Sequence, residues 1–202
     1  MMGGINCWRT DDGGVNWINT SSWNENSAAA GNYCHADIHA LEYFNDKLFV
    51  GSDGGIWETD NDGGDWTNIS QGLQITQSYR IAAFSDGGDD YVMTGAQDNG
   101  LNQLRNDGSG WGPLEHWEGA DGFEVSHDVA NNRIYGATPR GNLNVYTYPN
   151  VAFDTILRPE PGAWLTPHLY HPALGVLMAG YSDVWTTVDD PSPWVNISNG
   201  QI

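Results

Sequence analysis

The chain has 202 residues and carries 7 Lys and Arg against 26 Asp and Glu, which gives a formal net charge of −19 at neutral pH. Nucleic acid is therefore excluded as an expected partner, because no basic surface is available to displace the counterions of its phosphates. Cations, neutral glycans and basic protein surfaces remain candidate ligands. No run of about 18 apolar residues occurs, so the sequence predicts no membrane-spanning segment.

The N-terminal segment, MMGGINCW, lacks the basic and apolar regions of a secretory signal peptide. It contains Cys7, one of two cysteines in the chain, and the other is Cys34. The two cysteines either form a disulfide in an oxidising compartment or remain two buried thiols. Their spacing does not decide between these alternatives.

Three segments of the chain repeat one pattern: residues 3–21, 51–70 and 179–198. Each contains Thr-x-Asp/Asn-x-Gly/Pro-x-x-Trp and ends in Trp-x-Asn-x-Ser. A carboxylate or amide two residues before Gly can accept backbone N–H bonds across a tight turn, while the Trp packs beneath it. We therefore expect a structural role for these residues of the pattern: Thr10, Asp12, Gly14, Trp17, Thr59, Asn61, Gly63, Trp66, Thr187, Asp189 and Trp194.

A longer period runs through the whole chain. Short apolar segments end in Gly4, Gly51, Gly95, Gly136 and Gly180, at spacings of 47, 44, 41 and 44 residues. A period in the forties with about four short strands is typical of a β-propeller blade, whereas a β-sandwich would not show it. In the second repeat we expect strands near residues 38–44, 47–52, 56–59 and 66–69.

The predicted fold is all-β: a β-propeller with blades of four antiparallel strands and about four and a half to five blades. Residues 1–202 would form one propeller domain or a propeller fragment. A partial blade at 1–23 would precede blades at about 35–70, 78–117, 121–157 and 163–198. Three arrangements stay open: a fragment of a longer chain, an arc completed by further copies, and a five-bladed ring with an irregular first blade.

The pattern Thr10-x-Asp12-x-Gly14-x-x-Trp17 resembles the Asp box, or BNR repeat, of sialidases, xyloglucanase-type glycoside hydrolases and Vps10/sortilin-type propellers. The ordered segments HADIHAL, TGAQDNG, GADGFE and GAWLTPHLYHP resemble large secreted propellers of Bacteroidetes over nearly the whole chain. The second copy has Asn61 at the Asp position, and the third has Pro191 at the Gly position. The resemblance implies an extracellular or cell-surface protein, whose signal peptide this chain does not include, and structural Asp boxes away from any active face.

His35, Asp37 and His39 are the candidate metal ligands. Alternate side chains of a strand share one face, and two imidazoles with a carboxylate can hold a divalent cation. A polar network of the same residues is the alternative. We expect no cofactor, with Ca²⁺ or Zn²⁺ at this site as the open exception.

Short polar side chains cluster in the segments around residues 97–99 and 121, and we expect them near the mouth of the central channel. The candidate binding residues there are His35, Asp37, His39, Gln97, Asp98, Asn99 and Asp121. Asp-Asn-Gly and Ala-Asp-Gly are also turn sequences. A glycosidase would need two carboxylates about 5–10 Å apart, for which Asp37, Asp98 and Asp121 are the candidates.

The sequence thus favours a non-enzymatic propeller that binds glycans or proteins and is part of a larger secreted protein. A xyloglucanase-like glycoside hydrolase with paired Asp residues is one alternative. An architectural repeat in a multi-subunit assembly is the other, with further blades of a longer chain or other copies as its partners.

Overall fold

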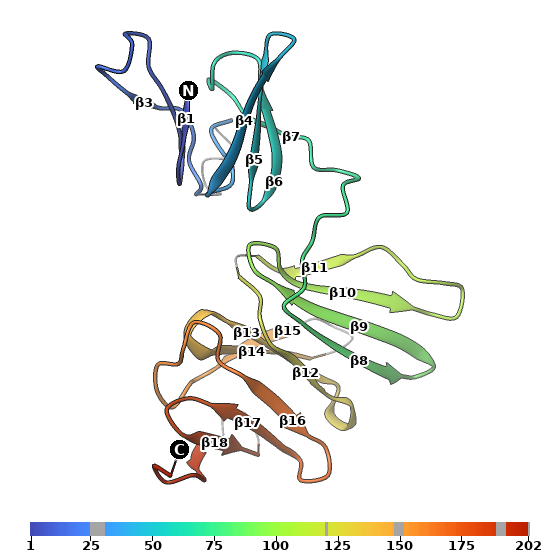
Figure 1. Cartoon of the computed structure of the whole chain (residues 1–202). Helices are drawn as coiled ribbons and strands as arrows, with labels where there is room; N and C mark the ends of the chain where they lie inside the picture. Colours follow the sequence, from blue (N-terminus) through green and yellow to red (C-terminus); the bar gives the residue numbers. More distant parts are fainter. Residues whose placement is uncertain (25–30, 120, 148–151, 189–192, 202) are drawn as a thin grey trace. The chain divides into compact units, whose positions relative to one another are not determined.

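The computed structural model describes residues 1–24, 31–119, 121–147, 152–188 and 193–201. The chain forms two compact units, Met1–Ile75 and Thr76–Ile202, which are coloured from blue to cyan and from green to red (Figure 1). In the described residues, the regular structure consists of antiparallel strands and two short 3₁₀ turns. No helix of the described residues is long and apolar enough to cross a membrane. The predicted fold class, all-β with propeller-type blades, is confirmed.

The first unit contains two sheets. The smaller sheet has three strands in the order β1-β2-β3, with the bounds Met2–Gly3, Cys7–Arg9 and Ile18–Asn19. The larger sheet has four strands in the order β4-β5-β6-β7, with the bounds Ile38–Phe44, Lys47–Ser52, Gly55–Thr59 and Thr67–Asn68. The first two expected strands of this repeat are therefore reproduced to the residue, and the last is shorter than expected.

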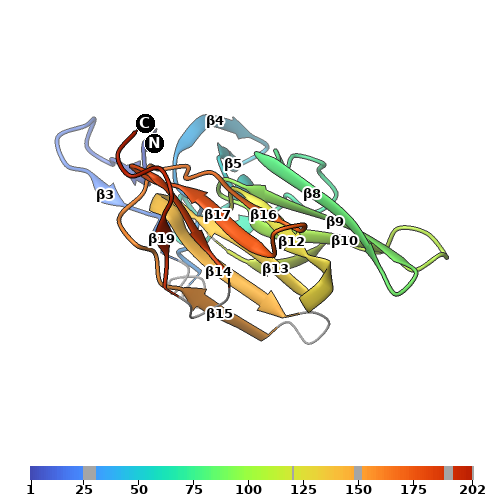
Figure 2. The ribbon, with the colours of Figure 1, turned by 90° about the horizontal axis from the view of Figure 1, so that it is seen from below.

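The second unit contains three sheets in which each strand pairs with the next along the chain, and Figure 2 shows their ribbons from below. The first has β8 to β11, at Arg80–Asp86, Asp89–Ala96, Gly100–Asn106 and Glu115–Glu118. The second has β12 to β15, at Val125–Asp128, Arg133–Thr138, Asn142–Thr147 and Ala152–Ile156. The third has β16 to β19, at His168–His171, Val176–Gly180, Val184–Thr187 and Val195–Asn196. The sheets, one of three strands and four of four, have the blade design that the 41- to 47-residue period predicts. The division into one propeller domain stays a prediction.

Within each unit, apolar clusters fill the space between successive sheets. In the first unit, Val50 and Trp57 of the larger sheet join Cys7 of the smaller one in a single cluster. In the second unit, one cluster joins Leu101 of β10 to Ile134 of β13. Another joins the middle and last sheets through residues such as Leu143 and Leu177. Each sheet therefore contributes to a core that it shares with its neighbour in the chain.

The repeated Thr-x-Asp/Asn turns make the same hydrogen bonds in both copies that the structure describes in full. The Thr10 hydroxyl donates to Asp12 and accepts from the N–H of Gly14, and Thr59 bonds Asn61 and the N–H of Gly63 in the same way. The Asp12 carboxylate also accepts the N–H groups of residues 15 and 16. Backbone hydrogen bonds from Asn16, followed by side-chain bonds, lower the pKa of Asp12 to about 2. In both of these copies, the Thr side chain and the Asp or Asn side chain therefore hold a turn by accepting backbone N–H groups. Asp189 of the third copy lies outside the described residues.

The tryptophan that ends the pattern joins neighbouring sheets. The indole N–H of Trp66 donates to the carbonyl of Thr20, 2.7 Å away, in the segment that follows the smaller sheet. Trp194 donates in the same way to the carbonyl of Leu157, at 2.8 Å, in the segment after β15. Trp17 instead donates to Gly14 of its own turn and is 40% exposed, whereas Trp66 is 7% exposed. The indole bond between sheets is a repeated element of this fold.

We predict that Trp66→Phe destabilises the first unit by about 1–3 kcal/mol, because the Thr20 carbonyl loses its buried donor while the aromatic ring is retained. Trp17→Phe is the matched control, since its indole bond lies on the surface, and we expect a change within about 0.5 kcal/mol. Chemical denaturation, monitored by fluorescence, measures the free energy of unfolding of both variants. Equal losses in the two variants would contradict a special role for the bond between sheets.

Two of the recurring glycines, Gly95 and Gly136, mark close approaches between sheets. A Cβ at Gly95 of β9 would lie 2.6 Å from the backbone nitrogen of Phe123 and closer still to its carbonyl oxygen. Phe123 belongs to the segment that leads into the next sheet and is fully buried. At Gly136 of β13, a Cβ would overlap the side chain of Leu101 in the preceding sheet. At these two positions of the glycine period, the missing side chain therefore permits close packing between sheets.

Gly95→Ala should destabilise the second unit by about 3 kcal/mol or more, because the atoms in the way belong to the backbone and cannot rotate aside. Gly4→Ala is the control at the equivalent position of the first repeat, where a Cβ would meet nothing within 4 Å. Thermal unfolding of the full chain compares the two variants. A Gly95→Ala protein as stable as Gly4→Ala would show that the close approach has no energetic weight.

Candidate functional site

The three predicted metal ligands do not lie along one strand. β4 begins at Ile38, so His35 and Asp37 precede it and only His39 lies within it. Asp37 has a positive φ of 59°, which is a turn conformation. The expectation that alternation would place the three side chains on one face is therefore wrong.

Both histidines of this segment contact the turn between β5 and β6. The Nε2 atom of His39 lies within hydrogen-bonding distance of the Asp53 carboxylate, and the His35 ring lies against Gly54, where a Cβ would overlap it. Within the described part of the chain, no group of three or more His, Cys, Asp or Glu is arranged to hold a metal ion. Cation binding by His35, Asp37 and His39 therefore stays a prediction, and the geometry of the described residues does not support it.

Gln97, Asp98, Asn99 and Asp121 are brought together in the second unit, whereas His35, Asp37 and His39 belong to the first. The backbone N–H of Asp98 donates to the Asp121 carboxylate at 3.0 Å. Asn99 donates to the carbonyl of Gln97 at 3.3 Å. Asp98 has a positive φ of 62° in the turn between β9 and β10. In this cluster the Asp121 carboxylate holds a turn by accepting a backbone hydrogen bond.

Two neighbouring residues that the sequence did not single out tie this turn region together. Tyr79 donates its hydroxyl to the Gln97 side chain at 3.0 Å. Arg80 forms an ion pair with Glu124 at 2.8 Å and thereby joins β8 to the segment before β12. These partners are 18 and 44 residues apart in the chain, so no local pattern could have revealed them.

A buried histidine lies under the same segment. His168, at the start of β16, is 7% exposed, and its Nε2 lies 3.2 Å from the carbonyl of Glu124. Its Nδ1 lies 3.1 Å from the hydroxyl of Ser126. Because a carbonyl only accepts, Nε2 carries the proton and Nδ1 accepts from Ser126 in the neutral ring. Burial lowers the pKa of His168 to about 4.

The His168 shift predicts an acid-sensitive second unit. The folded pKa lies below the unfolded value of about 6.5, so the unfolded chain binds the extra proton more tightly. Stability is then fully present above about pH 6.5 and is lost as the pH falls toward 4, by about 3 kcal/mol in total. Urea denaturation across this range measures the loss. His168→Gln should flatten this part of the profile, whereas His171→Gln, on the same strand, should keep it.

An open hollow of about 270 Å³ lies at the loop between β10 and β11. Its lining includes Arg105, Asp107, Trp111 and Glu115. Trp111 is 54% exposed, so much of its ring surface is available to a ligand. An exposed aromatic ring beside charged and hydroxyl side chains is a common composition for a recognition site.

Hydrogen bonds fix the loop that carries Trp111. Asn106 accepts through its side-chain oxygen from the N–H of Gly108 at 3.0 Å and of Gly110 at 3.3 Å. Asp107 accepts from the N–H and the hydroxyl of Ser109, at 3.0 and 2.6 Å. The Ser109 hydroxyl is the largest cause that lowers the pKa of Asp107. The loop therefore presents an ionised carboxylate in a defined position.

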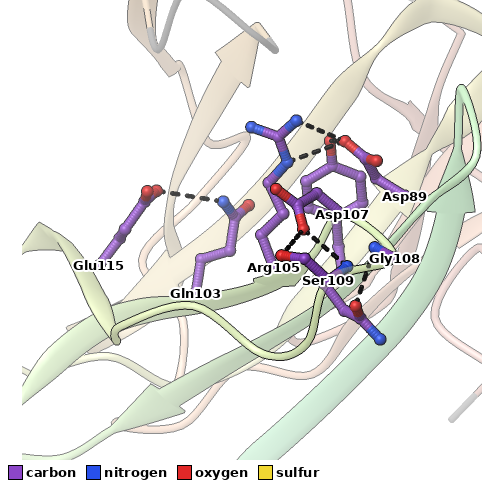
Figure 3. A network of polar contacts seen from close by, with 9 residues as sticks. Asp89, Gln103, Arg105, Asp107, Gly108, Ser109 and Glu115 are labelled. Carbon is purple, nitrogen blue, oxygen red and sulfur yellow. Dashed lines mark hydrogen bonds and ion pairs between the residues drawn. The ribbon is translucent and has the colours of Figure 1, made fainter.

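The strands beneath the loop hold its two flanks. The Arg105 guanidinium donates to Asp89 from Nε at 2.8 Å and from a terminal nitrogen at 2.5 Å, as Figure 3 shows. On the other flank, the amide of Gln103 donates to Glu115 at 3.3 Å. Gln103 is 1% exposed, and its side-chain oxygen has no hydrogen-bond partner among the described residues. The site is thus built on paired strands, with both acids and the arginine oriented by neighbours.

Sequence reasoning did not select this hollow. The segment NDGSGWGP, residues 106–113, reads as a turn, and the repeated pattern does not include it. A tryptophan within a run of turn residues was the available signal, because such a side chain has no strand face on which to be buried.

No protein-family model matches the chain, and a search of curated proteins found no match. Similar solved structures include Sqt1 from Saccharomyces cerevisiae, with 11% identity and a TM-score of 0.49 over 94% of this chain and 54% of that one. An auxiliary nutrient binding protein from Bacteroides ovatus ATCC 8483 has 12% identity and a TM-score of 0.47, over 82% and 43% of the chains. The GH74 enzyme of Niastella koreensis has 16% identity and a TM-score of 0.45, over 96% of this chain and 34% of that one.

This chain therefore spans less than two thirds of the length of each of these three proteins. Such low identities and TM-scores assign the chain to no family, and its fold class rests on its own sheets. The resemblance to Asp-box and Vps10-type propellers stays a prediction.

Proposed function

We propose that the protein is a non-enzymatic binding module that recognises neutral glycans through the hollow around Trp111. The observation that carries this proposal is an exposed tryptophan ring on a loop fixed by hydrogen bonds, flanked by ionised Asp107 and by Glu115. Sugar rings offer apolar C–H faces that pack on an indole, and their hydroxyls donate to carboxylate oxygens. A preformed loop reduces the entropy lost on binding.

Carboxylates that already accept hydrogen bonds from the protein favour a binding function over a hydrolytic one. A glycosidase acid needs a raised pKa so that it holds a proton at neutral pH. Asp107, which lines the hollow, instead has a lowered pKa, and the hydrogen bond from the Ser109 hydroxyl is the largest cause. Asp121, one of the three candidate catalytic acids, accepts a backbone N–H in a turn.

The wider setting of the proposal comes from the sequence. We propose that the Thr-x-Asp/Asn turns are Asp boxes and that the module acts outside the cell or at its surface. We further propose that it belongs to a larger secreted protein. The net charge of −19 suits a neutral ligand better than an anionic one. A basic protein surface would suit the same charge, and the experiment below separates the two.

Trp111→Ala should weaken binding of a neutral oligosaccharide by about tenfold or more, because the stacking surface is lost. Trp23→Ala is the matched control, since Trp23 is equally exposed, at 58%, and lies in the other unit. A panel of plant and microbial oligosaccharides on an array, followed by calorimetry on those retained, measures the effect.

Equal retention by Trp111→Ala and the native chain would contradict this site. Binding of basic peptides with no oligosaccharide retained would replace the glycan by a protein ligand. Turnover of a polysaccharide that is lost in Asp121→Asn would overturn the non-enzymatic assignment in favour of a glycoside hydrolase.

A further inference from the structure

The only two cysteines of the chain lie in one apolar cluster of the first unit. Cys7 on β2 and Cys34 before β4 are both 0% exposed. The cluster also contains Val50 and Trp57. Both thiols are free in this structure. The cluster joins the three-stranded sheet to the four-stranded one, with Cys7 on β2 and Cys34 in the segment that leads into β4.

The backbone brings the two cysteines to the same short segment. The carbonyl of Cys7 accepts the N–H of Thr20 at 2.9 Å, and the N–H of Cys7 donates to the hydroxyl of Ser21 at 2.8 Å. The N–H of Cys34 donates to the carbonyl of Ser22 at 3.2 Å. Three consecutive residues, 20 to 22, therefore fix the positions of both cysteines.

The two side chains also interact directly. A hydrogen bond between the thiols is the largest cause of both pKa shifts: it lowers the pKa of Cys7 and raises that of Cys34. The Ser21 hydroxyl also lowers the pKa of Cys7, whereas burial opposes this shift. The two buried thiols are therefore close enough to interact, as a disulfide between them requires.

We propose that Cys7 and Cys34 form a disulfide when the protein folds or opens in an oxidising environment. The oxidant is a small-molecule disulfide such as oxidised glutathione. The thiolate of one cysteine attacks one sulfur of this oxidant, its S–S bond breaks, and a thiolate leaves. The thiolate of the other cysteine then attacks the protein sulfur of the mixed disulfide and releases the second small thiol. The protein loses two electrons and two protons, and one oxidant molecule becomes two thiols.

The bond would fasten the three-stranded sheet to the rest of the first unit. That sheet has strands of only two or three residues. Val15 and Ile18, near its outer edge, are 80% and 51% exposed, so its own apolar burial is limited. A crosslink between residues 7 and 34 restricts the unfolded chain and adds a covalent link between this sheet and the segment that leads into β4.

The test uses the full chain, refolded or equilibrated in a glutathione redox buffer. Remaining thiols are blocked in denaturant with N-ethylmaleimide, and intact mass and a non-reducing peptide map are recorded. We expect no maleimide on the oxidised chain, two after reduction, and a single peptide that joins Cys7 to Cys34. We also expect the oxidised first unit to unfold about 5 °C or more above the reduced one.

Controls keep the result interpretable without relying on one variant. Comparing oxidised and reduced native chain involves no substitution, so a variant that fails to fold does not affect it. Cys7→Ala/Cys34→Ala should unfold at the same temperature with and without reductant. Retention of both thiols in the folded chain, an intermolecular disulfide, or a disulfide that lowers the unfolding temperature would overturn the proposal.

Discussion

Close approach between successive sheets is the constraint on which this structure depends. A short four-stranded sheet cannot bury its apolar residues alone, so each sheet needs the next one at backbone distance. Gly95 satisfies this need by leaving room for the backbone of Phe123. Trp66 and Trp194 hold neighbouring sheets together, because each donates its indole N–H to a carbonyl in the segment that follows the preceding sheet. Both devices recur because the geometric requirement recurs.

The strong negative charge follows in part from the same architecture. Many strands require many turns, and Asp and Asn are suited to turns because they accept backbone N–H bonds and tolerate a positive φ. Asp37, Asp62 and Asp98 all have a positive φ. Asp12 and Asp121 accept backbone N–H groups. Acid content alone is therefore weak evidence for catalysis in such a chain.

The parts of the fold that repeat could be predicted from the sequence, and the parts that occur once could not. Residues 38–44 and 47–52 were predicted as strands because apolar periodicity and flanking turns define them locally. The prediction that His35, Asp37 and His39 share one face was wrong, because side chains alternate only within a strand. Asp37 lies in a turn conformation, and the strand begins after it, at Ile38. The Arg80–Glu124 pair joins residues 44 positions apart, so only the folded packing reveals it.

The same distinction separates scaffold from recognition. A side chain that the repeat requires has its partners in the repeat, as the carboxylate of Asp12 does with residues 10, 15 and 16. The loop at residues 106–112 lies outside the pattern, yet hydrogen bonds fix it as firmly as the repeated turns. The repeat does not require this loop to be ordered, yet its hydrogen bonds hold it in place while Trp111 remains exposed. Rigid support beneath an exposed aromatic ring is what a binding surface needs, because the ligand then bears little of the cost of ordering it.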